Sequence, residues 1–152
     1  MISLRPASDA DAEWLFELHR AAMRTYVERT WGWDETWQAR FFKDHYDLST
    51  VQVIQSGARD VGVVRVSDEP SQIVLEMIEL LPEFQGQGIG TGLIRALLSR
   101  AKQRRVPVVL RVLKVNSRAK ALYQRLGFQS VGETETHDLM RYDPAAAAGD
   151  AA

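Results

Sequence analysis

One segment, residues 73–104, constrains the fold of this chain more than any other. It begins with the extended apolar run IVLEMIELL, passes Pro82 into the glycine-rich loop QGQGIGTG, and ends in a long amphipathic run. The apolar positions of the last run recur every four residues, at Ile89, Leu93, Leu97 and Ala101. This spacing predicts a helix. A strand, a glycine loop and a helix in direct succession bring backbone amides and a helix N-terminus together at one point, which attracts anions.

The residues before this segment predict one strand, two helices and two further strands. Residues 2–5 suit a first strand, and Ser8 and Asp9 offer capping oxygens to a helical run at residues 9–23. Residues 26–37 form an irregular aromatic stretch, after which a second helix runs to about Tyr46. The runs VQVIQ and VGVVRV are separated by polar turns, and with IVLEMIELL they predict three adjacent antiparallel strands.

The residues after the segment predict a buried strand, a helix and a closing hairpin. Pro107 introduces the run VVLRVLKV, and Asn116 and Ser117 can cap a helix that Gly127 ends. The runs FQSVGET and HDLMRY then predict two last strands. The order β α α β β β α β α β β predicts an α/β (α+β) domain, a mixed sheet with helices on its faces.

Composition places the chain among ordinary globular proteins of one domain. The 152 residues are 45% hydrophobic and carry a net charge of -1, so no nucleic-acid-binding footprint is expected. The absence of cysteine excludes thiolate nucleophiles and disulfides. No apolar run near the N-terminus suits a membrane span, and we expect a cytoplasmic protein. The domain is expected at residues 1–143, with a disordered tail at residues 144–152.

The glycine loop fits neither of two common phosphate-binding motifs. A dinucleotide fingerprint that starts at Gly86 requires glycine at Thr91, and one that starts at Gly88 requires glycine or alanine at Leu93. A Walker A loop requires glycine and lysine at residues 91 and 92, which are threonine and glycine. Two interpretations remain open, a pyrophosphate-binding loop of another kind and a flexible turn that opens a helix.

Two motifs resemble those of the GCN5-related N-acetyltransferases. In that family, glutamine or arginine is followed by two residues, a glycine, one residue, and glycine or alanine, which matches Gln85, Gly88 and Gly90 after a typical LLPEF. Independently, NSRAKALYQRLGF is similar to the family's fourth-helix segment. The resemblance covers the chain up to its tail. It implies a mostly antiparallel seven-stranded sheet with helices on both faces, and acetyl-CoA as the acyl donor.

The resemblance also implies where acetyl-CoA binds. The backbone at Ile78 and Leu80 would run beside the pantetheine arm, and Asn116 would contact the pantetheine or the thioester. The pyrophosphate would be held by residues of the loop and the first helical turn, namely Gln85, Gly86, Gln87, Gly88, Ile89, Gly90 and Thr91. A helix N-terminus suits a pyrophosphate for the reason given above.

The implied reaction is direct attack by a primary amine on the thioester in a ternary complex. Tyr123 is the candidate that assists the departing thiolate, because a phenol can donate a hydrogen bond or a proton to it. The alternative is that Tyr123 only continues the apolar stripe of its helix.

Glu79 is the candidate base that removes the amine proton. Glu76 precedes it by three residues, so the two carboxylates should lie on opposite faces of the strand. A plain surface carboxylate is the alternative interpretation of Glu79. Some relatives use a glutamate in the fifth strand instead, and the corresponding residue here is Arg111.

The predicted acceptor site lies between Trp31, Trp33 and His137 of the final hairpin. The two indoles would form flat apolar walls, and nearby carboxylates, at Asp34, Glu35 and Glu135, would attract a cationic amine. This composition favours a small amine with an apolar body, although the tryptophans could instead be plain core residues.

Several alternatives stay open at this stage. One is a protein or peptide N-acetyltransferase, and another is a non-catalytic acyl-CoA-binding module. The paired terminal strands are compatible with a homodimer. The histidines, His19, His45 and His137, lack metal-ligand spacing, so we predict no metal and interpret each as an ordinary surface or capped residue.

Overall fold

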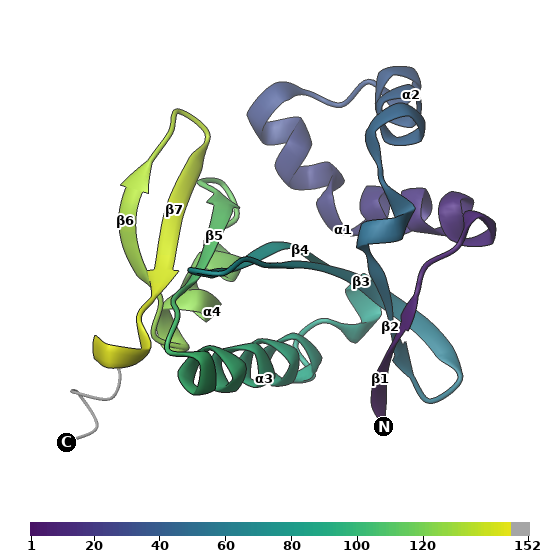
Figure 1. Ribbon diagram of the computed structural model, residues 1–152. Coiled ribbons are helices and arrows are strands. Elements are labelled where there is room, and N and C mark those ends of the chain that lie inside the picture. The colour runs from purple at the N-terminus through teal and green to yellow at the C-terminus, as the bar shows by residue number, and fades with distance from the viewer. Residues whose placement is uncertain (147–152) are drawn as a thin grey trace. The chain divides into compact units, whose positions relative to one another are not determined.

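The computed structural model describes residues 1–146 and contains a seven-stranded sheet in the order β1-β2-β3-β4-β5-β7-β6 (Figure 1). The strands are β1 (Ile2–Pro6), β2 (Gln52–Ser56), β3 (Arg59–Asp68), β4 (Ile73–Leu80), β5 (Val108–Leu113), β6 (Gln129–Glu133) and β7 (His137–Tyr142). The helices are α1 (Ala12–Trp31), α2 (Glu35–His45), α3 (Ile89–Arg104) and α4 (Ser117–Arg125), with short 3-10 turns η1 (Asp9–Asp11), η2 (Leu48–Thr50) and η3 (Pro82–Phe84). The predicted fold class and element order are confirmed.

Most strand pairs are antiparallel, as expected. The pairs β1 with β2, β2 with β3, β5 with β7, and β6 with β7 all run antiparallel. Strands β4 and β5 run parallel and pair from Ile73 with Val108 to Leu75 with Leu110. Such a pair needs a crossover, and α3 lies in the connection between the two strands.

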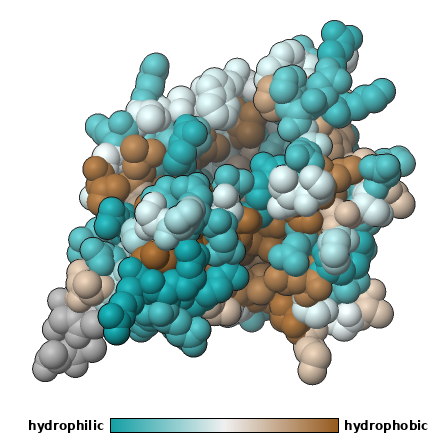
Figure 2. Space-filling model, in the orientation of Figure 1, coloured by the Kyte–Doolittle hydropathy of each residue, from teal (hydrophilic) through white to brown (hydrophobic). Residues whose placement is uncertain are grey.

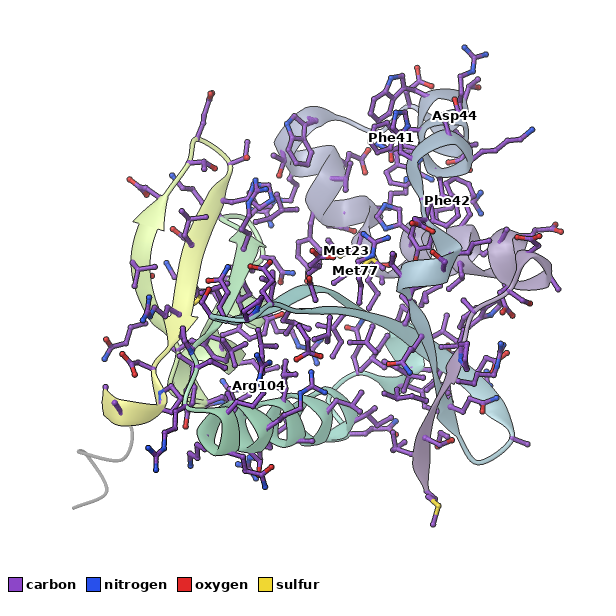
Figure 3. All side chains as sticks on the ribbon, viewed as in Figure 1. Met23, Phe41, Phe42, Asp44, Met77 and Arg104 are labelled. Atoms are coloured by element: carbon purple, nitrogen blue, oxygen red, sulfur yellow. The ribbon has the colours of Figure 1, made fainter. Side chains whose placement is uncertain are left out.

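The chain forms two compact units. The first consists of Met1–Arg65 and Met77–Ile89, and the second consists of Val66–Glu76 and the residues from Gly90 onward. In the first unit, helix α1 covers a core cluster made by Leu15, Leu18, Val51 and Val63. Phe42 of α2 and Met77 of β4, both labelled in Figure 3, pack against this cluster.

Helix α1 is longer than predicted, because residues 26–31 are helical rather than irregular. They contain neither glycine nor proline, and the buried side chain of Val27 extends the apolar face of the helix. The helix ends where Gly32 adopts a φ of 84°. Asp34 then caps α2 by accepting a hydrogen bond of 2.9 Å from the Trp37 amide. The irregular stretch is therefore confined to residues 32–34.

In the second unit, α4 ends as the sequence predicts. Gly127 has a φ of 102°, and the Phe128 amide donates to the Tyr123 carbonyl oxygen at 3.0 Å. The buried face of α3 differs from the predicted stripe, and its residues are Ile94, Leu97, Leu98 and Ala101. They follow the three- and four-residue spacing of a helical face, which leaves Ile89 and Leu93 half-buried.

The C-terminal part of the chain begins with a helical turn at residues 144–146. The rest of the expected tail, residues 147–152, lies outside the described residues.

Candidate functional site

Strand β4 places Glu79 inside the first unit. Its exposed fraction is 6%, whereas Glu76, three residues earlier on the same strand, is exposed. The prediction that the two carboxylates lie on opposite faces of the strand is therefore confirmed, and Glu79 is not a plain surface residue. A buried carboxylate is costly unless polar groups stabilise it, so its neighbours define its chemistry.

His19 of α1 contacts this carboxylate. Its Nδ1 lies 2.8 Å from Oε2 of Glu79, and the exposed fractions of the two side chains are 24% and 5%. The interpretation of His19 as an ordinary surface or capped residue was wrong. The sequence contained a signal for its position, because His19 follows Leu15 by four residues and so lies on the buried face of α1.

The environment of His19 favours its charged form. Burial by itself lowers the pKa of the imidazole, but the hydrogen bond and the charge of Glu79 outweigh burial and raise that pKa above its ordinary value. The ring lies 6.2 Å from that of Trp33 and 6.3 Å from that of Phe42, measured between centroids. Aromatic rings thus flank the polar pair.

Oε1 of Glu79 and the hydroxyl of Tyr46 are buried, and neither atom has a hydrogen-bond partner among the described residues. Tyr46 follows α2, and its ring stacks on that of Phe42 at 4.1 Å. Burial and the charge of Glu79 raise the pKa of Tyr46, and Arg65, whose guanidinium lies 5.3 Å from the ring centroid, opposes the shift. The phenol therefore remains a neutral donor at physiological pH. Polar atoms left without partners in this way are unusual in native interiors and suggest the place of a ligand or a water.

The predicted acceptor-site tryptophans differ in exposure. Trp31 ends α1 and is 61% exposed, whereas Trp33 is half-buried and donates from Nε1 to Oε2 of Glu35 at 2.6 Å. Glu35 also pairs with Arg20 at 2.5 Å. The hydrogen bonds from Trp33 and Arg20 lower the pKa of Glu35. Its charge is therefore already compensated, which reduces its attraction for a cationic substrate.

The glycine loop between β4 and α3 is preorganised. Gly86 and Gly88 have φ values of 73° and 84°, which other residues rarely adopt. The side chain of Gln85 donates to the Leu80 carbonyl oxygen at 3.0 Å, and that of Gln87 donates to the Glu83 carbonyl oxygen at 2.8 Å. Both glutamines thus fold back onto the chain and fix the loop.

The loop and the start of α3 fit a pyrophosphate. A Cβ added at Gly88 would have no described heavy atom within 4 Å, so a ligand can approach this backbone. Helix α3 begins at Ile89, and its first turn continues with the uncharged residues Gly90, Thr91 and Gly92. The amides of a first turn have no partner within the helix and favour an anion.

In the second unit, α4 positions two further predicted residues. Asn116 caps the helix, and its Oδ1 accepts a hydrogen bond of 3.2 Å from the Ala119 amide. Tyr123 is 9% exposed, and its ring meets that of Phe128 edge-on at 5.7 Å. Burial raises the pKa of Tyr123 to about 12, so its hydroxyl remains protonated at physiological pH.

His137 opens β7 in the same unit. Its Nδ1 lies 2.8 Å from Oγ1 of Thr136 and 3.4 Å from Nη2 of Arg111. Burial and the positive charge of Arg111 lower the pKa of His137. The charge of Arg111 thus favours a neutral imidazole at His137.

Hydrophobic residues on the face shown in Figure 2 lie in patches between hydrophilic ones. None of the helices in residues 1–146 is both long and apolar enough to cross a membrane. Within the same residues, histidines and carboxylates do not form a cluster of three or more that could hold a metal ion.

A profile of the Acetyltransferase (GNAT) family matches residues 13–128. This match spans well over half of the chain. The chain belongs to the GNAT acetyltransferase family. The matched region includes His19, Glu79, the glycine loop and Tyr123, and it excludes His137.

Curated GNAT relatives act on different amines. The chain is 39% identical to the N-alpha-acetyltransferase RimI of Mycobacterium tuberculosis over 82 residues, which are 51% of each chain. It is 38% identical to the thialysine N-epsilon-acetyltransferase of Bos taurus over 72 residues, 47% of this chain and 42% of the relative. It is 35% identical to the 5-NmdU N-acetyltransferase of Pseudomonas phage PaMx11 over 71 residues, 47% of this chain and 49% of the relative. The chain spans about half the length of these relatives.

Solved GNAT structures share the fold. The PaiA N-acetyltransferase of Thermoplasma acidophilum, determined in complex with coenzyme A, has a TM-score of 0.76 at 17% identity, over 94% of this chain and 99% of that one. The ribosomal-protein-S18-alanine N-acetyltransferase of Escherichia coli has a TM-score of 0.65 at 18% identity, over 94% of both chains.

Proposed function

We propose that this GNAT protein transfers an acetyl group from acetyl-CoA to the primary amine of a small molecule by direct attack in a ternary complex. The observation that carries this proposal is the buried carboxylate of Glu79, whose Oε1 has no hydrogen-bond partner among the described residues. The conformation of the glycine loop on the same unit supports it, because β4 leads from Glu79 through η3 into that loop.

Acetyl-CoA, when bound, supplies the activated acetyl thioester. Residues of the loop and of the first turn of α3 would hold its pyrophosphate, namely Gln85, Gly86, Gln87, Gly88, Ile89, Gly90 and Thr91. The pairing of β4 with β5 ends at Leu75. The main chain of Ile78 and Leu80, further along β4, would run beside the pantetheine arm. Asn116 would contact the arm near the thioester through its amide nitrogen, because its oxygen caps α4.

Glu79 would act as the base. An acceptor amine is mostly protonated at neutral pH because its pKa lies between about 8 and 10, and only the neutral amine attacks. Oε1 would accept the proton, while Oε2 keeps its hydrogen bond with His19. The neutral hydroxyl of Tyr46, buried near this carboxylate, would help to hold the substrate by a hydrogen bond.

Tyr123 would assist the leaving group. Its phenol is protonated at neutral pH and can donate to a developing thiolate, whose conjugate acid has a pKa near about 8.5. Because burial raises the pKa of Tyr123, the hydroxyl is a weaker acid than an ordinary phenol. Hydrogen bonding would therefore contribute more than complete proton transfer.

Trp31, Trp33 and His137 remain the proposed acceptor-binding residues. The half-buried ring of Trp33 near His19 favours a compact amine with an apolar body. A protein N-terminus is the second candidate acceptor, and the similarity to RimI favours it.

A transfer assay tests the proposal. Release of free thiol from acetyl-CoA would be measured with a panel of polyamines, amino acids, lysine analogues, aminoglycosides and peptides with free N-termini. The expected result is saturable, amine-dependent thiol release with a small amine as the best acceptor. A higher kcat/KM for peptides would support the second candidate, and coenzyme A binding without release for any amine would show a non-catalytic binding module.

A further inference from the structure

His19 and Glu79 form a buried pair that the mechanism above uses only in part. The two residues are 60 positions apart in the sequence, and the contact between Nδ1 and Oε2 joins α1 to β4 within the first unit. This hydrogen bond occupies one carboxylate oxygen and leaves the other without a partner among residues 1–146. The two oxygens of Glu79 are therefore not equivalent.

The position of the His19 ring is fixed by several contacts. Trp33 and Phe42 flank it at 6.2 and 6.3 Å, and Leu15 and Leu18 anchor the same face of α1 in the core. A ring held in this way fixes the orientation of the carboxylate to which it bonds.

We infer that His19 is a positioning residue for acetyl transfer, which holds Oε2 of Glu79 so that Oε1 receives the proton of the acceptor amine. This inference rests on the proposed function. The proton moves from the substrate ammonium to Oε1, and the electron pair of the broken N–H bond stays on nitrogen. That pair then forms the bond to the acetyl carbon while the C–S bond breaks. The departing thiolate takes the second proton lost by the nitrogen, so coenzyme A leaves as a free thiol and no further reactant is needed.

The protonation state of His19 would also change the charge beside Oε2 of Glu79. The imidazolium is a cation that repels the cationic acceptor amine, and this repulsion ends when the ring loses its proton. Loss of the ring proton removes this charge but leaves an Nδ1–H donor. Because Glu79 raises the pKa of His19, the acid limb of the activity profile should lie above the ordinary histidine value of about 6.5.

Other charged and polar groups lie near the pair. Arg65 of β3 lies against the Tyr46 ring, with its guanidinium 5.3 Å from the ring centroid. Arg20, next to His19 on α1, is paired with Glu35. The neighbouring phenol of Tyr46 has a raised pKa and remains neutral. His19 is the member of this group whose pKa is raised by its contact with Glu79.

Two substitutions separate positioning from packing. Asparagine in His19→Asn retains an N–H donor near the position of Nδ1 but cannot titrate, whereas His19→Leu fills the space without a donor. We expect His19→Leu to lower kcat about ten-fold or more with little change in the KM for acetyl-CoA. His19→Asn should retain most of the wild-type kcat, but its pH–activity profile should no longer show the acid limb. His45→Asn serves as the matched control, because His45 is exposed on α2.

The outcomes distinguish this inference from the proposed function. If the wild type transfers acetyl groups and His19→Leu retains its kcat and pH profile, the positioning role is wrong and the proposed function stands. If the wild type transfers no acetyl group to any amine, the proposed function is wrong. Should His19→Leu fail to fold, as judged by circular dichroism, the profile of His19→Asn decides. An acid limb unchanged from the wild type would then overturn the inference.

Discussion

Nδ1 of His19 lies 2.8 Å from Oε2 of Glu79 in the interior of the first unit. The contact links a titrating imidazole on α1 to a carboxylate on β4, at the end of the strand that leads into the glycine loop. Folding therefore changes the proton affinity of the histidine, and the candidate base depends on a residue from another element. Stability and activity should both respond to this pair.

The pair should make stability depend on pH. The pKa of His19 is higher in the folded than in the unfolded chain, so its contribution is fully present below about pH 6.5 and is lost as pH rises through the folded-state pKa. We expect the melting temperature of the wild type to fall relative to that of His19→Asn as pH rises from about 6 to 8.5. Thermal unfolding at several pH values measures this difference. A difference that grows in the opposite direction would contradict the raised pKa.

Glu79→Gln should remove the base while retaining the shape of the side chain. We expect kcat to fall roughly a hundred-fold or more, within the range for general acid-base groups, with little change in acetyl-CoA affinity. Glu76→Gln is the matched control on the exposed face of the same strand, and its kcat should remain near that of the wild type. Equal effects of the two substitutions would exclude Glu79 as the base.

Short-range patterns in the sequence predicted much of the fold. The order of strands and helices followed from periodicity and turn residues, and the alternation of a strand correctly placed Glu79 and Glu76 on opposite faces. The pairing of His19 with Glu79 did not follow, because it joins residues brought together only by tertiary packing. The helical state of residues 26–31 was missed for a related reason. Their aromatic and β-branched residues are weak helix formers, and the burial of Val27 overrides that preference.

Gly62 of β3 permits a close approach of β4 at the candidate base. A Cβ at this position would lie 2.7 Å from Cδ2 of Leu80 and still closer to the Glu79 carbonyl oxygen. Gly62→Ala should therefore destabilise the protein by about 1–3 kcal/mol, because backbone and a packed side chain must move. The control is Gly132→Ala in β6, where the added atom would meet Leu139 Cδ1 at an ordinary 3.4 Å. Chemical denaturation compares the two variants, and equal stabilities would show that β4 shifts without cost.

Gly88 allows loop conformation and ligand binding to be tested separately. Alanine at this position is strained because φ is 84°, and we expect a loss of about 1–2 kcal/mol in stability together with weaker acetyl-CoA binding. Gly57→Ala is the matched control, because Gly57 has a φ of 61° in the turn between β2 and β3 and likewise has no described atom within 4 Å of an added Cβ. The Gly57→Ala variant should be destabilised by a similar amount and should keep the wild-type affinity for acetyl-CoA. Calorimetric titration with acetyl-CoA distinguishes the two variants. Equal affinities would show that Gly88 is only a turn residue and does not contribute to acetyl-CoA binding.

Tyr123→Phe tests the leaving-group role, because it removes only the hydroxyl and retains the ring that packs against Phe128. We expect kcat to fall about ten-fold or more with little change in the KM for the acceptor or in the melting temperature. Because burial raises the pKa of Tyr123 to about 12, the hydroxyl stays protonated throughout the assay range, and the substitution should lower the pH profile without shifting it. Tyr142→Phe, at another buried tyrosine of the same unit, is the control and should retain its kcat. If both variants keep wild-type turnover with the best acceptor, Tyr123 only packs within the apolar stripe of α4 and does not assist the leaving group.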